Sequence, residues 1–289
     1  VRGIYEDQEK GGGGVLMRGT GFYWKKVLFC LVVLAILFVT VFPFLYMVLG
    51  AFKNTVDIVN PSKTFHFVPT IKNFIQVFET YQFQKPLINS LIISFGATGL
   101  SLLIGLPASY SMARYKQNML QIVVLCIRIV PSIAFLVPVY LMFSKIGLTG
   151  TYTGIILANM LIAVPFVVWV MIPYFEGVPV ELEESALIDG ASRMTCFLRI
   201  MLPLSLPGIM TVTILSFINA WNNFMFGLIL GNSDTKILPT VIFNFLSHTE
   251  INWSGLMAAA IIVTLPIILL SVFLQRYIVQ GLTAGAVKG

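Results

Sequence analysis

Six long windows of the sequence are almost free of charged side chains, and this feature constrains the fold more than any other. They cover residues 27–52, 86–113, 117–144, 146–175, 200–233 and 251–275, and only the third is interrupted, by Arg128. Each exceeds the roughly 20 apolar residues that a helix needs to cross a bilayer. The first is too long for a signal-peptide core and lacks a small-residue cleavage site. We therefore predict an all-α membrane protein with six transmembrane helices.

The scarcity of charge excludes a soluble globular enzyme. Charged residues make up 10% of the 289 residues, whereas an ordinary soluble domain carries roughly 25%. So few charged side chains cannot cover the water-facing surface of a chain this long. The net charge of +6 is attributed to membrane orientation, and no nucleic-acid partner is expected.

Six spans place both termini on the same side of the membrane. If that side is the cytoplasm, the inner segments hold eleven basic residues and the outer segments hold six, all of them lysines. The positive-inside rule favours this orientation, with both termini cytoplasmic. We expect a flexible N-terminal tail at 1–26, a transmembrane domain at 27–279 that includes a cytoplasmic loop at 176–203, and a C-terminal tail at 280–289.

Residues able to perform chemistry are rare. The only imidazoles are His66 and His248, and Cys30, Cys126 and Cys196 have no paired spacing, so we expect no catalytic residue, metal or cofactor. A P-loop sequence is absent, so the chain is not expected to bind ATP by that motif. A membrane-embedded enzyme would need His or acidic residues in the spans. A stand-alone, ion-coupled transporter usually buries a carboxylate there. The windows contain none of these residues, and no internal repeat supports the second alternative.

The inner loop at 176–203 carries the most patterned sequence. Pro179 suits the first turn of a helix, and three glutamates follow it where the helix dipole favours anions. Gly190 can end that helix in a left-handed conformation, and Ser192 can cap a second one. The glutamates are Glu181, Glu183 and Glu184.

This loop also carries apolar residues that need a partner. They are Leu182, Ala186, Leu187 and Met194. An amphipathic linker lying on the membrane surface is one explanation. However, the negative potential of the inner leaflet repels an acidic helix. Docking onto a basic protein surface explains the pattern better.

The residues of this loop resemble a known family. Glu184-Ser185-Ala186, three residues, Gly190, nine residues and then Ile200-x-Leu202-Pro203 is similar to the cytoplasmic "EAA" signature of ABC-importer permeases, with Ser185 where alanine is usual. Three further segments look like the smaller permease of the maltose type: the ending at 275–289, Asn89-Ser90 at the start of the second window, and residues 220–224 in the fifth.

The resemblance implies a type I ABC-importer transmembrane domain in the inner membrane of a bacterium. Such a chain would form half of a translocation pathway with a second permease and work by alternating access. Its other partners would be two cytoplasmic ATPase subunits and an extracytoplasmic solute-binding protein that delivers carbohydrate. Residues 181–190 would be the coupling helix, docked in an ATPase cleft through Glu181, Glu184, Ser185, Ala186, Asp189 and Gly190. The tail at 281–289 would reach the ATPase dimer interface, or would be a frayed terminus.

A substrate path needs polar side chains within the apolar spans. Asn219, Trp221, Asn222 and Asn223 could bind the hydroxyls and stack on the ring of a sugar. They could equally hold helices together. Arg128 precedes Pro131, where we expect a kink, and must face water, carbonyls or an anionic group. It could attract an acidic saccharide or take part in a helix break or gate.

The outer loop at 231–254 corresponds in position to one that touches the binding protein in the family. Phe245, Leu246 and Trp253 are the expected contacts, unless the loop simply caps the bundle. Within ABC permeases, another solute such as glycerol phosphate or an acidic oligosaccharide remains an alternative to a neutral carbohydrate.

Overall fold

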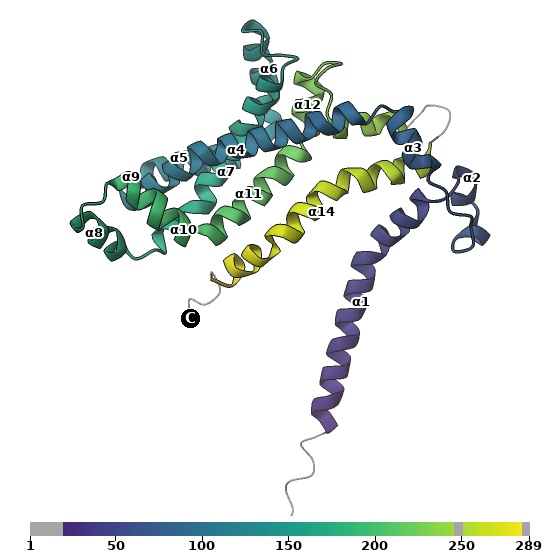
Figure 1. The fold of residues 1–289 in the computed structure, drawn as a ribbon, viewed down its shortest axis with the longest axis horizontal. Coiled ribbons are helices and arrows are strands. Elements are labelled where there is room, and N and C mark those ends of the chain that lie inside the picture. Colours follow the sequence, from purple (N-terminus) through teal and green to yellow (C-terminus); the bar gives the residue numbers. More distant parts are fainter. Residues whose placement is uncertain (1–19, 246–250, 285–289) are drawn as a thin grey trace, which may run out of the picture. The chain divides into compact units, whose positions relative to one another are not determined.

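The chain is mainly helical in the part that the structure describes, residues 20–245 and 251–284 of a computed structural model (Figure 1). Those ranges contain no β-strand, so the all-α prediction is confirmed. Residues 1–49 and 50–289 form two compact units, and each is described by itself.

The first unit consists of helix α1, Thr20–Ala51, up to residue 49. An 18-residue window within residues 24–51 has a mean hydropathy of 3.0, which suits a membrane span. The helix begins at Thr20, so residues 20–26 are helical although we expected them in the flexible tail. The rest of that predicted tail, 1–19, lies outside the described residues.

The second unit contains three long single helices and two broken ones. The single helices are α4 (Gln84–Arg114), α7 (Tyr152–Glu176) and α14 (Trp253–Ala284). The first break separates α5 (Asn118–Ile129) from η2 (Ser132–Phe135) and α6 (Leu136–Lys145), with a bend of 91°. The second separates α9 (Arg193–Cys196), η3 (Phe197–Met201) and α10 (Leu202–Leu204) from α11 (Leu206–Trp221), with a bend of 78°.

With α1, four described helices are long and apolar enough to cross a membrane, or six if each bent pair is one span. All six charge-poor windows therefore fall on helices. The fifth also includes α12 (Phe224–Leu230), which follows α11 after a short interruption.

The centre of the second unit is the contact between α4 and α7. A Cβ atom at Gly105 would lie 2.6 Å from Cγ1 of the buried Val167, so glycine is needed there for the two helices to approach. Helix α11 contacts both of them and also α14. The face of α4 buried in this arrangement carries small and hydroxyl side chains, among them Ser94, Thr98, Ser101 and Ser109.

Shorter helices lie at the two ends of α4 (Figure 1). At one end are α9 and α8 (Val180–Ile188), and we call this the loop end. At the other, which we call the far end, is α3 (Lys72–Glu79). Before α3 come α2 (Thr55–Ile58) and η1 (Pro61–Lys63), and before α14 come α13 (Leu238–Val241) and η4 (Ile242–Phe245). The first interhelical loop, 53–85, thus contains three short helices.

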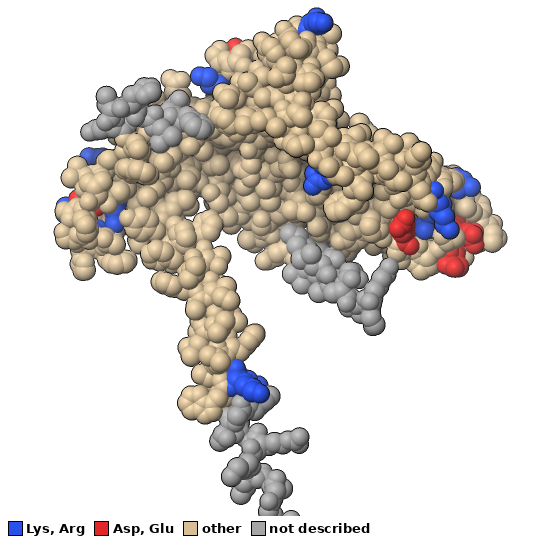
Figure 2. All heavy atoms as spheres, turned by 180° about the vertical axis from the view of Figure 1, so that it is seen from behind, with Lys and Arg blue, Asp and Glu red and all other residues tan. Residues whose placement is uncertain are grey.

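Charged side chains are concentrated at the ends of the second unit. Figure 2 shows acidic and basic residues gathered over α8 and α9, while the broad surface between the ends is almost free of charge. At the loop end, α4 and α5 are joined by a tight turn in which Lys116 has a φ of 48°.

Candidate functional site

The segment at 176–203 folds as its sequence predicts. Pro179 is the N-cap residue of α8, and Glu181 and Glu183 stand in the first turn, where the helix dipole favours carboxylates. Gly190 has a φ of 88°, a left-handed conformation that glycine adopts without steric cost. The Ser192 hydroxyl then accepts a hydrogen bond from the Thr195 N–H at 3.2 Å and caps α9.

Helix α8 presents an exposed surface that is both acidic and apolar. Glu181, Glu184 and Asp189 are exposed, as are Ser185 and Gly190, while Ala186 is half-buried. Ile188 is 86% exposed. The apolar residues for which we predicted a partner outside the chain, Leu182, Leu187 and Met194, are also exposed. The predicted docking residues Glu181, Glu184, Ser185, Asp189 and Gly190 are therefore accessible to a partner, and Ala186 is partly accessible.

Glu183 behaves differently from its two neighbouring glutamates. Its side chain is buried, and its Oε2 lies 2.8 Å from Nε of Arg114, the last residue of α4. The Arg114 guanidinium also donates a 2.9 Å hydrogen bond to the Val178 carbonyl. Sequence reasoning placed all three glutamates together in the first turn and did not find this contact. The available signal was the arginine that directly follows the second window, Arg114.

A cavity of about 630 Å³ lies beside two breaks in the helices. One is the break at Val130–Pro131, between α5 and η2, and the other is a further break at Asn222–Asn223, between α11 and α12, distinct from the bend between α10 and α11. Both breaks line the cavity. Irregular backbone at membrane depth is tolerated where it is buried in protein or lines a water-filled cavity, so the location suits a polar path.

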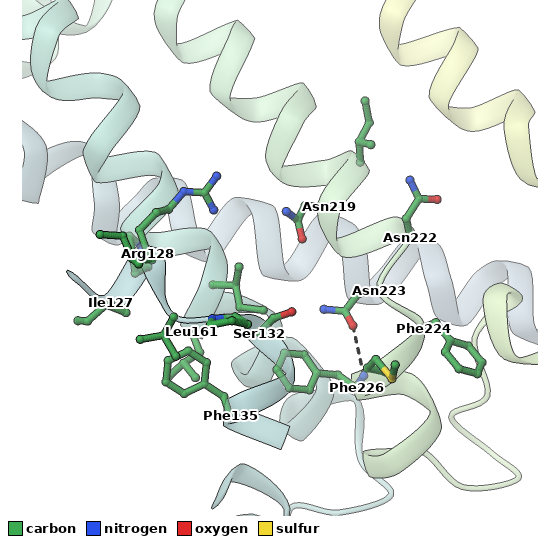
Figure 3. Close-up of a pocket in the computed structure, with 17 residues that line it drawn as sticks. Ile127, Arg128, Ser132, Phe135, Leu161, Asn219, Asn222, Asn223, Phe224 and Phe226 are labelled. Atoms are coloured by element: carbon green, nitrogen blue, oxygen red, sulfur yellow. Dashed lines mark hydrogen bonds between the residues drawn. The ribbon is translucent and has the colours of Figure 1, made fainter. Parts of the chain in front are cut away.

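Four of the five predicted path residues line this cavity: Arg128, Asn219, Asn222 and Asn223. Figure 3 shows Arg128 and Asn219 pointing toward one another, although they come from α5 and α11. The Arg128 guanidinium lies over the ring of Phe166, 4.7 Å from its centroid. Within 20–245 and 251–284, Arg128 forms no ion pair with an acidic residue.

Asn223 has a structural role in addition to its place in the cavity. Its Oδ1 accepts a 3.2 Å hydrogen bond from the Phe226 N–H and so caps α12 (Figure 3). Asn219 and Asn222, by contrast, are exposed in the cavity lining.

Trp221 does not join the other predicted path residues. Its side chain is only 1% exposed, and its Nε1 donates a 3.1 Å hydrogen bond to the Val263 carbonyl of α14. Its ring stacks on Phe217, with the ring centroids 5.6 Å apart. Our prediction that Trp221 lines the path is corrected: an indole at a helix end can pack inward, and here it joins α11 to α14.

The predicted contacts for a binding protein also separate. Phe245 is buried, with its ring against those of Tyr81 and Phe83. This corrects the expectation of an exposed contact, because the apolar ring fills the interior at the far end. Trp253 is 41% exposed and remains accessible. Leu246 lies outside the described residues.

Within the described ranges, no group of three or more His, Cys, Asp or Glu residues could hold a metal ion. The geometry therefore offers two sites, an exposed acidic helix at the loop end and a cavity at the helix breaks.

Comparison with known proteins places this arrangement among transport proteins. Residues 97–284 match the sequence profile of the family described as "Binding-protein-dependent transport system inner membrane component". A probable ABC transporter permease protein, y4oR of Sinorhizobium fredii, is 36% identical over 266 residues, which cover 91% of this chain and 96% of that protein. The trehalose/maltose transport system permease protein MalG of Thermococcus litoralis is 32% identical, with 92% and 98% covered.

The fold is also similar to that of a solved structure. A chain of a bacterial ABC transporter involved in the import of the acidic polysaccharide alginate superposes with a TM-score of 0.77. The identity is 16%, and the alignment covers 91% of this chain and 99% of that one. At this identity the likeness concerns the fold.

Proposed function

The chain belongs to the family of binding-protein-dependent transport system inner membrane components, and we propose from this premise that it is a permease subunit of an ATP-driven carbohydrate importer. Membership of this family implies an ATPase and a solute-binding protein as partners. The finer composition that we propose is one second permease, forming a heterodimer with this chain, and two ATPase subunits. We further propose that ATP hydrolysis belongs to those subunits and that this chain catalyses no bond chemistry.

The observation that carries the proposal is the exposed surface of α8. Helix α8 exposes both carboxylates and large apolar side chains. Such a surface is poorly suited to an anionic lipid surface and well suited to a basic cleft in a protein. Glu181, Glu184, Ser185, Ala186, Asp189 and Gly190 are the proposed docking residues. We propose that the loop end and both termini are cytoplasmic, in agreement with the distribution of basic residues.

The cavity at the helix breaks is the proposed substrate path of this subunit. Asn219 and Asn222 supply amide donors and acceptors that suit sugar hydroxyls, and both line the cavity. The name of the trehalose/maltose relative supports carbohydrate as the substrate class. In the working cycle, closure of the ATPase dimer would push α8, and the cavity would then become accessible from the outer side.

Uptake by the reconstituted complex tests the proposal. The importer that co-purifies with this chain is placed in liposomes with its binding protein, and uptake of maltose, trehalose and neutral oligosaccharides is measured with and without ATP. We expect uptake of at least one of these sugars that requires ATP, and about tenfold less uptake for the double variant Asn219→Ala/Asn222→Ala. Sugar uptake driven by an ion gradient without ATP would contradict the proposal.

An acidic saccharide is a second candidate substrate, and Arg128 is the observation that favours it. Its guanidinium faces the cavity without an acidic partner among the described residues. In a low-dielectric site such a cation attracts a carboxylate. If this candidate is right, Arg128→Gln reduces uptake of an acidic oligosaccharide far more than that of a neutral one. If Arg128→Gln reduced uptake of the acidic and the neutral oligosaccharide equally, Arg128 would instead have a role in the helix break.

A further inference from the structure

Helix α4 is held at both of its ends by polar side chains that reach across to other segments. We propose that Arg114 and Asn89 are positioning residues that make α4 a connecting rod between the α8 loop and the outer loop at 231–238. This inference rests on the proposed function and deepens it, since it assigns the internal contacts that carry motion from the ATPase side to the outer side.

The loop end of the rod is centred on Arg114. Both Arg114 and Glu183 have side chains only 10% exposed, and their closest charged atoms are 2.8 Å apart. The same guanidinium bonds to the Val178 carbonyl and contacts Sδ of Met201 at 3.3 Å. One side chain of α4 thereby contacts the segment before α8, helix α8 itself and the end of η3.

A second contact ties α9 to the same place. The Arg193 guanidinium lies over the ring of Tyr115, the residue that follows α4, at 5.6 Å from its centroid.

The ion pair between Arg114 and Glu183 is the stronger of these contacts. Breaking a buried ion pair by removing one partner leaves an uncompensated charge and is strongly unfavourable. A displacement of α8 therefore carries the end of α4 with it.

The far end of the rod is centred on Asn89. Its Nδ2 donates hydrogen bonds to the carbonyls of Asp234 at 2.9 Å and Lys236 at 2.8 Å. Its Oδ1 accepts a 2.7 Å hydrogen bond from the Tyr152 hydroxyl at the start of α7. Asn89 itself is only 1% exposed, and its three hydrogen bonds are partly buried.

Two neighbours of Asn89 strengthen this attachment. The Ser90 hydroxyl accepts a 2.8 Å hydrogen bond from the N–H of Leu238, and Lys85 forms an ion pair with Asp234 at 2.5 Å. The Lys85 ammonium lowers the pKa of the Asp234 carboxyl below its usual value. The ion pair therefore persists at mildly acidic pH and is lost only as the pH falls through that lowered pKa.

The helix between the two ends is continuous. It runs for 31 residues without a break although it contains Pro107, and at 1.5 Å per residue it is about 46 Å long. Two of the spans that line the cavity are interrupted, at residues 130–131 and 222–223, whereas α7, which also lines it, is continuous. The continuous helix thus runs without interruption between its non-covalent contacts with the α8 loop and those with the outer loop.

The test uses the complete importer complex in lipid nanodiscs. Cys30, Cys126 and Cys196 are replaced by serine, and Asn222→Cys serves as a reporter in the cavity. A membrane-impermeant maleimide labels the reporter with and without ATP and vanadate, and ATP turnover and retained ATPase are measured in parallel. In the parent complex we expect vanadate trapping to increase labelling.

The expected result for Arg114→Ala is retained ATPase and ATP turnover, with the vanadate-dependent increase in labelling reduced about 2- to 30-fold, the range of such couplings. Glu183→Gln is expected to have a similar effect. The double variant Arg114→Ala/Glu183→Gln should reduce the labelling response no more than either single variant does, because the two residues act as a pair. Asn89→Ala should weaken the same response from the far end. Arg199→Ala is the matched control, since Arg199 is an exposed basic residue of the same loop.

A response equal to the parent's in Arg114→Ala and in Asn89→Ala would overturn the inference. If Arg114→Ala fails to assemble, Arg114→Lys and Glu183→Gln replace it, and an undiminished response in both would overturn the inference. A parent complex that holds no ATPase, or that shows no vanadate-dependent labelling, would instead contradict the proposed function.

Discussion

At the scale of single residues, α4 and α7 pack so closely that one added carbon atom is expected to change the stability of the protein. Gly105 and Gly99 are both in α4, but a Cβ at Gly105 would meet Val167 while one at Gly99 would have no atom within 4 Å. Replacing glycine by alanine in a helix gains up to about 1 kcal/mol of helix propensity. Overpacking a tight interior typically costs about 1–3 kcal/mol. Replacing Gly105 by alanine should therefore destabilise the protein, whereas replacing Gly99 by alanine should stabilise it slightly.

We predict that Gly105→Ala lowers the thermal unfolding midpoint of the detergent-solubilised protein and that Gly99→Ala raises it slightly or leaves it unchanged. A differential scanning measurement of both variants beside the parent protein checks this. Equal midpoints for the two variants would show that the α4–α7 contact is looser than described.

The residue scale is also where sequence reasoning reached its limit. It identified Glu181 and Glu184 as exposed docking residues, but it could not separate Glu183 from them, because burial of a carboxylate depends on a distant arginine. It likewise placed Trp221 in the substrate path. A tryptophan beside three asparagines gives no sign of which way its ring points, and the contact that decides this, with Val263, comes from a helix 42 residues away.

At the scale of elements, the cap of α12 is the feature most open to a test. Asn223 stands at the break after α11 and accepts the Phe226 N–H. Removing an N-cap side chain costs about 1 kcal/mol, while aspartate and asparagine cap equally well. We predict that Asn223→Ala lowers the unfolding midpoint and that Asn223→Asp does not. A lower midpoint for Asn223→Asp as well would mean that the amide nitrogen, rather than the cap, is what matters.

The turn that ends α8 offers a second test. Gly190 is left-handed, a conformation that costs other residues roughly 1–2 kcal/mol but that asparagine tolerates comparatively well. We predict that Gly190→Val weakens retention of the ATPase at least about threefold in a pull-down, because the strain reorients α8. Gly190→Asn should retain it nearly as the parent does. If both variants lost the ATPase, the position would require the absence of a side chain rather than the left-handed backbone angle.

Elements were predicted well wherever a local signal fixed their ends. Pro179, Gly190 and Ser192 act through their own backbone or the next turn, and α8 and α9 begin and end where these residues indicate. The break at residues 222–223 was not predicted. The fifth window reads as one uninterrupted apolar stretch, and the caps that divide it involve asparagines that also suit a substrate path.

At the scale of the whole molecule, the described structure joins an accessible acidic helix, a continuous helix and a cavity at two helix breaks. These three features are what a transport subunit needs in order to receive force, transmit it and change access to a path. Composition and the six windows were sufficient to predict the membrane fold, because burial in lipid imposes long apolar helices. They could not predict how the helices break, which depends on contacts between spans.

The most direct test of the central claim is co-purification from gently solubilised native membranes, comparing the parent chain with Glu184→Lys and Glu181→Ala. The account predicts that the parent recovers a second permease and a P-loop ATPase. Reversing the charge of the exposed Glu184 should abolish recovery of the ATPase while keeping the second permease, and Glu181→Ala should only reduce it. Recovery of the folded parent chain alone, or of undiminished ATPase with Glu184→Lys, would contradict the claim that α8 docks the importer's ATPase.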